Sequence, residues 1–223
     1  MPELTVSMGT FQIAGHGRSC ADSGFLRRYR EGTVFTLVEG ACDGMSGKVR
    51  TSLAAAVLAE QSGAGEPPER WLASLRTLWS KTQDETLPSF ALLRVTASGL
   101  AELYLHRLPP LLCFHQGRRT VPALEQTLIS GAELAWGTFR LREGDDLLFY
   151  TRGLLQGDVK NPRSGRWDSE LLFALLDPLV AAGTDGPGLA KEISRAYRSQ
   201  CRDSSSRDAS CFVLHFLSAP LRP

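Results

Sequence analysis

The chain has 223 residues, 43% of them hydrophobic, which is enough for one sizeable core and little more than one domain. The net charge is +1 and no basic stripe with interleaved aromatic residues occurs, which argues against a nucleic-acid-binding protein. No apolar run approaches the roughly 20 residues that span a bilayer, and the N-terminus has no signal-peptide pattern. We therefore expect a cytoplasmic protein without a membrane partner.

Strands and helices alternate unevenly in the first half of the chain. In chain order we expect a strand over residues 4–14, a turn over 15–17, a short strand end over 18–22, a buried strand over 33–38, and helices over 48–60 and 69–82. The second helix carries an apolar face made of Trp71, Leu72, Leu75 and Leu78. Both helices are therefore expected to cover a sheet.

The second half is richer in strands. We expect strands over residues 89–95, 101–106, 111–115 and 141–151, helices over 168–182 and 188–200, a polar loop over 202–207, and a last strand over 209–217. Helices thus come in adjacent pairs, unlike the strand–helix alternation of a parallel sheet. This order predicts an α/β fold of antiparallel sheets with helices packed on their outer faces.

The cysteines and histidines carry no metal-binding pattern. The five cysteines are scattered, and none forms a Cys-x-x-Cys pair. The four histidines are also isolated from one another. This pattern predicts free thiols in a reducing compartment and argues against a zinc site.

The turn after the buried strand over residues 33–38 is the most informative short segment. It contains Asp43 and Gly44, so an acid lies in a glycine turn where backbone approaches a ligand closely. Such a place suits a hard-cation ligand or a phosphate. Residues 42–49 nearly match a phosphate-binding loop, but an acid inside it would repel phosphate. Ser46 also resembles a nucleophile in a tight turn, although no histidine is a convincing partner.

Several short motifs follow one another along the chain, each of them weak alone. They are Ser19-Cys20-Ala21-Asp22, Asp43-Gly44-Met45-Ser46-Gly47, a hairpin with a proline-rich corner from Leu103 to Leu112, Gly144-Asp145-Asp146-Leu147-Leu148-Phe149-Tyr150-Thr151-Arg152-Gly153, a loop from Asn161 to Gly165, and Arg207-Asp208-Ala209-Ser210. In this order the chain resembles the metal-dependent serine/threonine phosphatase (PPM) family, and looks closest to its bacterial branch typified by stage II sporulation protein E. The resemblance covers about residues 17–217 of a single domain over 1–223.

The resemblance implies both a fold and a chemistry. The fold is a sandwich of two antiparallel β-sheets flanked by helices (αββα), which agrees with the order of the predicted elements. The chemistry uses two Mn²⁺ or Mg²⁺ ions that activate a water for attack on a phosphoryl group. By this resemblance Asp43, with the carbonyl of Gly44, is the bridging metal ligand and Asp22 is the supporting acid. Asp43 and Asp22 are therefore the candidate catalytic and metal-binding residues.

Two further acids of that metal site are replaced in this chain, by Arg152 and Arg207. Two carboxylates become two guanidiniums, so the formal charge at these positions changes by four units. Arginine cannot deprotonate, and each like-charge contact costs roughly 4 kcal/mol at about 4 Å and an effective dielectric of about 20. We therefore expect a divalent cation to be excluded, and Asp208 alone would not restore the site. The nearby acids expected to be solvated turn residues are Asp145, Asp146 and Asp158.

Two uses of the arginines follow from their charge. We hypothesise that Arg152 and Arg207 are internal counter-ions that hold Asp43 and Asp22 without any metal. Alternatively, the same arginines bind a phosphoserine of another protein.

The sequence leaves two main classes of function open. One is a catalytically impaired phosphatase-like protein that binds a phosphoprotein or regulatory partner in bacterial signalling, with no cofactor. The other is an active Mn²⁺- or Mg²⁺-dependent phosphoserine/phosphothreonine phosphatase with an altered metal set. A third is a structural subunit that retains the fold alone. The resemblance implies partners such as anti-sigma antagonist proteins or stress-signalling scaffolds.

Overall fold

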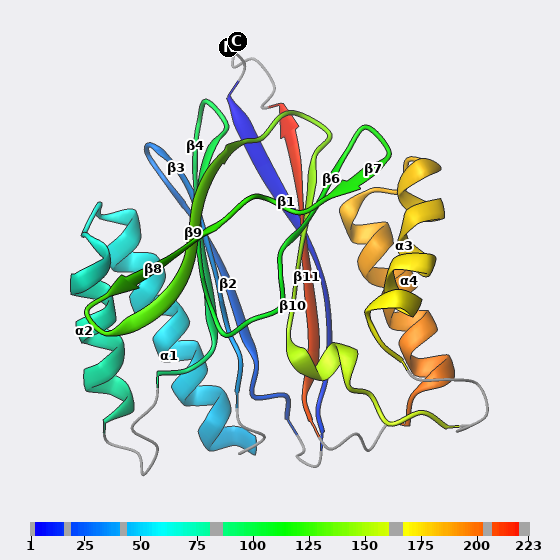
Figure 1. The fold of residues 1–223 in the computed structure, drawn as a ribbon, viewed down its shortest axis with the longest axis horizontal. Helices are drawn as coiled ribbons and strands as arrows, with labels where there is room; N and C mark the ends of the chain where they lie inside the picture. The colour runs from blue at the N-terminus through cyan, green and yellow to red at the C-terminus, as the bar shows by residue number, and fades with distance from the viewer. Residues whose placement is uncertain are drawn as a thin grey trace.

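The protein is a four-layered sandwich in the part of the chain that the structure describes. The structure, a computed structural model, describes residues 3–15, 19–40, 44–80, 87–160, 167–202 and 207–218. Two antiparallel β-sheets lie face to face, and a pair of helices covers the outer face of each (Figure 1).

Each sheet combines segments from distant parts of the chain. Sheet A has the order β1 (Leu4–Ile13), β11 (Ala209–Ser218), β10 (Asp146–Tyr150), β6 (Leu112–His115) and β7 (Arg118–Thr120). Sheet B has the order β2 (Ser23–Tyr29), β3 (Gly32–Val38), β4 (Phe90–Thr96), β5 (Leu100–His106), β9 (Ala132–Arg140) and β8 (Glu125–Ile129). The first and last described strands are neighbours, because β1 pairs with β11 over ten residue pairs from Leu4↔Ser218 to Ile13↔Ala209.

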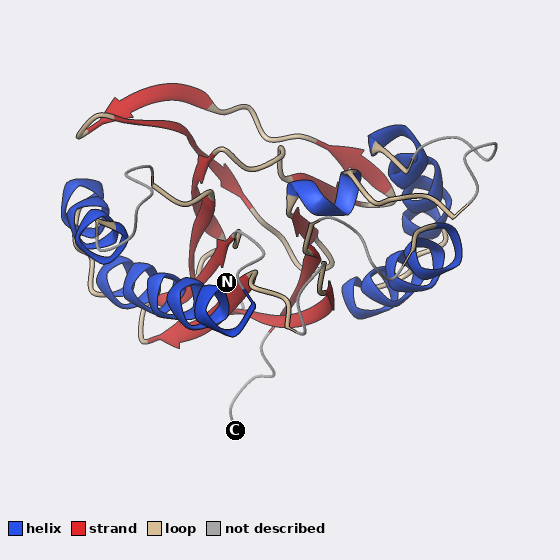
Figure 2. Cartoon of the chain, turned by 90° about the horizontal axis from the view of Figure 1, so that it is seen from below, coloured by secondary structure: helices blue, strands red, loops and turns tan. Residues whose placement is uncertain are grey.

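The helices form one pair beside each sheet, as the view from below also shows (Figure 2). Sheet B is covered by α1 (Gly44–Gly63) and α2 (Pro68–Trp79), and sheet A by α3 (Ser169–Ala181) and α4 (Gly186–Gln200). A short 3₁₀ helix, η1 (Arg152–Leu155), follows β10. Asp168 and Asp185 cap α3 and α4 by accepting hydrogen bonds from first-turn amides, which fixes where these helices begin. None of the described helices has the length and apolar character that crossing a membrane requires.

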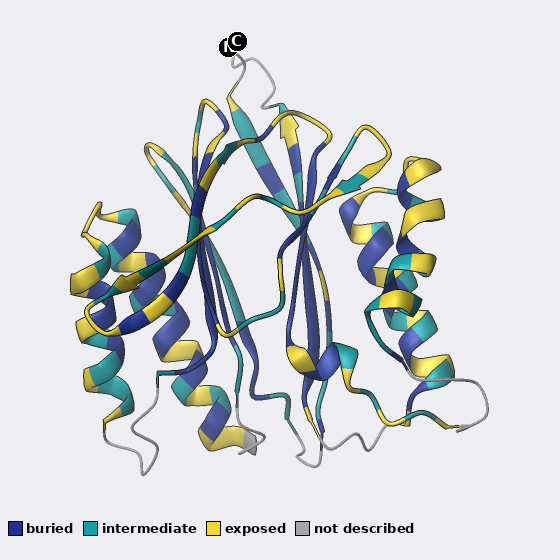
Figure 3. Ribbon diagram, viewed as in Figure 1, coloured by how far each residue is buried: buried dark blue, intermediate teal, exposed yellow. Residues whose placement is uncertain are grey.

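Three apolar clusters hold the four layers together. One lies between sheet A and α3/α4, one between the two sheets, and one between sheet B and α1/α2. Buried residues accordingly fill the sheets and the inward helix faces, while exposed residues line the outward helix faces (Figure 3). The predicted αββα sandwich is confirmed.

Most predicted elements occur close to their expected bounds. The apolar face of α2 points inward as predicted, with Trp71, Leu72 and Leu75 fully buried. Helix α1 starts earlier than expected, at Gly44, and β10 is shorter than the expected strand over residues 141–151. The shortening has a local cause: Gly144 has a φ of +82°, and this turn separates residues 141–143 from β10.

Four strands were not predicted: β2, β7, β8 and β9. Strands β2 and β8 form the two edges of sheet B, where one side of the strand has no neighbour in the sheet. Their side chains are partly exposed and their alternation is weak, so periodicity gave no strand signal. The β8–β9 turn uses Ser130 and Gly131 at φ angles of 47° and 76°, a left-handed pair that suits a tight hairpin.

The contact between the sheets predicts the effect of one core substitution. Phe35 of β3 is 1% exposed, and its ring lies 4.8 Å from the Phe149 ring and 5.8 Å from the Phe212 ring, both of sheet A. Replacing Phe35 with alanine is expected to lower the free energy of unfolding by about 3–5 kcal/mol, because the cavity lies between two stiff sheets. Urea denaturation measures this loss. Leu217→Ala, at a position that is 40% exposed, is the control and should cost under about 1 kcal/mol.

Candidate functional site

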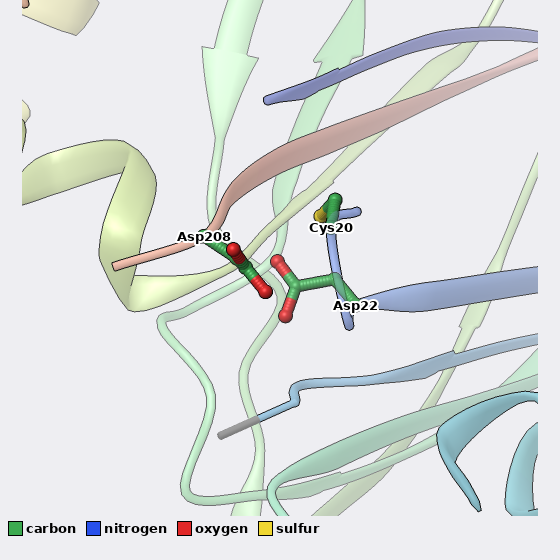
Figure 4. A group of neighbouring side chains, drawn as sticks. All are labelled: Cys20, Asp22 and Asp208. Carbon is green, nitrogen blue, oxygen red and sulfur yellow. The ribbon is translucent and has the colours of Figure 1, made fainter. Parts of the chain in front are cut away.

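The described segments that carry predicted site residues meet at one end of the sandwich, where segments of both sheets come together. Residues 19–22 precede β2, residues 39–40 follow β3, and residues 207–208 precede β11. Three side chains from these segments, Cys20, Asp22 and Asp208, place ligand atoms within 4.8 Å of one another. Figure 4 shows the carboxylates of Asp22 and Asp208 directed toward each other. Two predicted acids therefore do lie together.

Asp22 is fully buried and hydrogen-bonded. Its Oδ1 accepts from the Gly40 amide at 2.8 Å, and its Oδ2 accepts from the Ser210 hydroxyl at 2.8 Å. Burial raises the pKa of Asp22 to about 7, the two hydrogen bonds oppose the shift, and the charges of Glu39 and Asp208 add to it. Near neutral pH this carboxyl therefore carries only part of a negative charge.

Asp208 serves the fold directly. Its Oδ1 accepts from the Gly15 amide and its Oδ2 from the Ala21 amide, each at 2.6 Å. The side chain is buried, and it ties the start of β11 to the segment between β1 and β2. Both carboxylate oxygens thus satisfy backbone donors that would otherwise be buried without a partner.

Cys20 lies close to the two aspartates, and its side chain is a neutral thiol. Burial raises the pKa of Cys20 to about 12, and the negative charge of Asp22 adds to the shift. Its Sγ lies 3.4 Å from the Ser210 hydroxyl. A thiol that keeps its proton is neither a good nucleophile nor a good metal ligand.

Arg152 forms a clamp with Glu39, and sequence reasoning missed this partner. The Arg152 amide donates to Glu39 Oε1 at 2.9 Å, while its Nε and Nη2 donate to Glu39 Oε2 at 3.0 and 2.7 Å. Nη2 also donates to Ser89 Oγ at 3.0 Å. Glu39 follows β3 of sheet B and Arg152 follows β10 of sheet A, so this Arg152–Glu39 clamp joins the two sheets.

The hypothesis that Arg152 is the counter-ion of Asp22 is wrong for this arginine. Among the described residues, the Asp22 carboxylate takes its hydrogen bonds from Gly40 and Ser210, and Arg152 is committed to Glu39. The reason is geometric: Asp22 is buried between the sheets, whereas the side chain of Arg152 is 46% exposed at the rim. The Glu39 side chain is 10% exposed, which is more than that of Asp22 and less than that of Arg152.

Lys48 is a second cation that sequence reasoning did not place at the site. It lies in the second turn of α1, and its Nζ donates to the backbone carbonyl of Asp22 at 2.5 Å. Thr51, one turn further, donates from its hydroxyl to the carbonyl of Ala21. The segment before β2 is therefore bound to α1 by two side chains on one helix face.

Arg207 lies beside the glycine of η1. A Cβ atom on Gly153 would lie 3.3 Å from the Arg207 Cβ and only 1.8 Å from the Asp208 carbonyl oxygen. Glycine is therefore required at position 153 so that η1 can approach the start of β11. Arg207 itself is exposed, so both substituted positions lie at the rim of the site.

Several predicted residues stand elsewhere. Asp43 and the loop from Asn161 to Gly165 lie outside the described residues, and Gly44 is the first residue of α1. The expectation that Asp145 and Asp146 are solvated is wrong. They are buried, and their carboxylates contact the Nδ1 atoms of His115 and His215 at 2.5 and 2.8 Å.

The described residues do not supply the donors that two divalent cations need. Hard cations take about six oxygen ligands, mostly carboxylates and water. Here Glu39 is bound by Arg152, Asp208 is bound by two amides, and Asp22 has a raised pKa. Two cationic groups, Arg152 and Lys48, also lie at the same end of the sandwich. The described part of the site thus combines the buried acids Asp22 and Asp208 with the cationic groups Arg152 and Lys48, while Asp43, the predicted bridging ligand, lies outside the described residues.

Comparisons with known proteins identify the fold through solved structures, whereas the sequence comparisons found no match. The chain matches no family model, and no curated protein matches it significantly in sequence. The phosphatase domain of SpoIIE from Bacillus subtilis has a similar structure, with a TM-score of 0.69 at 14% identity. That match covers 100% of this chain and 97% of the SpoIIE chain.

Other solved structures give the same result. The RsbU and RsbW domains of a Mycobacterium tuberculosis protein match with a TM-score of 0.74 at 16% identity, over 98% of this chain and 63% of that one. The SiaA PP2C domain of Pseudomonas aeruginosa matches with a TM-score of 0.69 at 16% identity, over 92% and 85%. At such identities the similarity establishes the fold, which is that of bacterial PP2C (PPM) phosphatase domains.

The Arg152–Glu39 clamp predicts a stability loss in Glu39→Gln. The glutamine keeps one oxygen for the Arg152 amide but sets an amide group against the guanidinium. Since a hydrogen bond to a charged group is worth about 1.5–3 kcal/mol and Arg152 is half exposed, we expect a loss of about 1–2 kcal/mol in urea denaturation. Glu192→Gln, in a surface pair with Arg195, is the control and should stay within about 0.5 kcal/mol. Equal losses in the two variants would contradict the clamp.

Asp22 predicts a pH-dependent stability in chelator-treated protein. Its pKa is raised from 3.8 to about 7 in the folded state, so the folded protein binds more protons than the unfolded chain between these values. Stability contributed by this group is therefore present at low pH and lost as pH rises from about 4 to 7. Asp22→Asn should remove this loss, so its melting temperature should exceed that of the unmodified protein at pH 8 and approach it at pH 5. An equal difference at both pH values would contradict the raised pKa.

Proposed function

We propose that this protein is a PPM-type phosphatase-like protein that binds a phosphorylated partner protein in bacterial signalling and is catalytically impaired. The observation that carries the proposal is the Arg152–Glu39 clamp. In the family that the chain resembles, an acid stands at the position of Arg152. Here the position supplies a guanidinium, which also occupies the carboxylate of Glu39.

The charge distribution at the rim supports anion binding. Arg152 uses its Nε and Nη2 for Glu39 and Ser89, and in the described part of the chain no hydrogen bond engages its Nη1. A guanidinium edge matches the oxygens of a phosphoryl group. Lys48 adds a second cation. Beneath them Asp22 is partly protonated near neutral pH, which reduces its repulsion of an anion.

The kind of partner follows from the proteins of similar fold. One solved neighbour is described within the bacterial stressosome, and another, PppA of Pseudomonas aeruginosa, as a regulatory component of T6SS. By analogy we assign this protein a phosphoserine- or phosphothreonine-bearing regulatory protein as its ligand. Binding without turnover would protect or sequester that phosphorylated partner.

The alternative is an active phosphatase with an altered metal set. It is favoured by the buried acid Asp22 and by the solved structure of RsbX, which contains magnesium and has the same fold. In that case Asp22 and Asp43, with the carbonyl of Gly44, would hold the metal. A bound Mn²⁺ or Mg²⁺ would supply an activated water.

Replacing Arg152 and Arg207 with aspartate distinguishes the proposed function from the alternative. We expect the unmodified protein to show no Mn²⁺-dependent rise in melting temperature, and no hydrolysis of p-nitrophenyl phosphate above that of Asp43→Asn. The double variant Arg152→Asp/Arg207→Asp removes two cations and frees Glu39. It should gain a Mn²⁺-dependent rise in melting temperature and at least a tenfold gain in hydrolysis, because transition states of metal-assisted hydrolysis need these charges.

A second measurement tests the anion site itself. Phenyl phosphate should shift the amide resonances at the rim of the unmodified protein, and Arg152→Gln should weaken this binding at least tenfold, with Arg195→Gln as the surface control. Mn²⁺-dependent hydrolysis by the unmodified protein that disappears in Asp43→Asn would establish the alternative instead.

A further inference from the structure

Sheet B opens into a hollow at the end that carries β8 and β9. Strand β9 pairs with β5 up to Leu105↔Ala135, and beyond this pair the β8–β9 hairpin diverges from the corner that follows β5. A cavity of about 800 Å³ lies between them. Figure 2 shows the hairpin projecting away from the body of the sandwich. The residues that line the cavity and matter here are Arg76, Arg107, Val121, Leu124, Leu128 and Glu133.

The apolar part of this hollow is exposed to an unusual degree. Leu128 of β8 is 69% exposed, and Val121 in the segment before β8 is 56% exposed. Leu128 pairs across the hairpin with Glu133, so its side chain lies on the face that borders the cavity. Leu124, from the segment that crosses to β8, adds a partly buried wall. Val121, Leu124 and Leu128 line the same cavity, so the exposed apolar side chains form a group there and not isolated surface positions.

The backbone of β8 adds a second attraction. Strand β8 is the last strand of sheet B, and in the described part of the chain it pairs with β9 alone. Edge strands usually carry lysine, proline or an inward-pointing charge that prevents pairing. Strand β8 is short and begins with Glu125, but Leu128 near its end is uncharged and exposed, so an extended chain can add beside this part of the edge through main-chain hydrogen bonds.

The charges at the cavity select the chemistry of the occupant. Arg107 is exposed and has a φ of 55°, a left-handed conformation that a non-glycine residue adopts at a cost. It follows His106, whose Nδ1 lies 2.8 Å from the Glu133 carbonyl oxygen and whose pKa is lowered by burial, so that ring is neutral. Arg76 of α2 also lines the cavity. Two guanidiniums against Glu133 leave a net positive wall, which favours an acidic ligand.

The hollow is also close to the candidate site. His106 pairs with Phe90 across β4 and β5, and Phe90 directly follows Ser89, which Arg152 binds. Leu87, two residues before Ser89, lines the cavity itself. The hollow and the rim that Arg152 forms are therefore joined by one short segment, from Leu87 to Ser89.

We propose that the hollow and the edge of β8 form a docking groove for an extended segment of a partner protein. The segment adds as a strand beside β8, places an apolar side chain against Leu128 and Leu124, and sets a neighbouring carboxylate against Arg107. This assignment of a partner rests on the proposed function, in which the phosphorylated residue of the same partner lies at Arg152. Binding of the segment in the groove does not depend on Arg152.

Peptide selection on the full chain tests the groove without knowledge of the partner. A displayed library of random decapeptides is selected on the immobilised protein and counter-selected on Leu128→Asp. We expect an enriched pattern of an apolar residue near Asp or Glu. A synthetic peptide of that pattern should bind at least tenfold more weakly to Leu128→Asp and to Arg107→Glu. The surface variant Leu217→Asp is the matched control and should bind normally, and melting temperatures verify that all variants fold.

A charge swap makes the test specific to the groove. Selection on Arg107→Glu should enrich Lys or Arg in place of the acidic residue. Enrichment of no pattern, or of peptides that bind both groove variants as well as the unmodified protein, would overturn the proposal. It would also be overturned by a dimer of the unmodified protein in sedimentation that Leu128→Asp dissociates, since a second copy would then cover the edge.

The two proposals fail separately. Arg152→Gln should leave binding of the selected peptide unchanged while it weakens binding of phenyl phosphate. Loss of phosphate binding with retained peptide binding contradicts neither. Normal phosphate binding in Arg152→Gln overturns the proposed function alone, and loss of peptide binding in Arg152→Gln overturns the groove as a separate site.

Discussion

The end of the sandwich that holds the candidate site is organised by carboxylates that bind backbone and arginine. Asp208 fixes the start of β11 to residues 15 and 21, and Asp22 binds the amide that follows β3. Glu39 then joins the two sheets through Arg152. Each of these acids thus accepts hydrogen bonds that connect segments near the site, and the cationic groups Arg152 and Lys48 lie at the same end of the sandwich.

This arrangement explains how one fold can support two kinds of chemistry. A carboxylate at position 152 would repel Glu39 and draw in a divalent cation, whereas a guanidinium at the same position neutralises Glu39 and draws in an anion. The elements that place the position are the same in both cases: β10, η1 and the start of β11. Under the proposed function, two side chains at the rim alter the preferred ligand, and neither of them belongs to the three apolar clusters.

The sequence predicted the layers of the fold better than its edges. Buried strands such as β3 and β11 are continuous apolar runs, so periodicity located them. Strands β2, β8 and β9 mix exposed and buried side chains, and pairing with their neighbours, rather than local pattern, makes them strands. In the site, motif order predicted Asp22 as the supporting acid and gave Asp208 only as a possible additional ligand. Glu39 and Lys48 were missed, because their roles depend on contacts with Arg152 and with the Asp22 carbonyl that sequence spacing does not contain.

Gly153, the glycine that follows Arg152, is required by the fold and not by the chemistry of the site. Any side chain there would collide with the carbonyl of Asp208, so the architecture demands glycine whether or not the neighbouring position bears an acid. A search pattern centred on that glycine would thus collect chains that keep the scaffold and have exchanged their reactive groups. Under the proposed function, the residue one place earlier, Arg152, and its ion pair with Glu39 carry the difference between catalysis and binding.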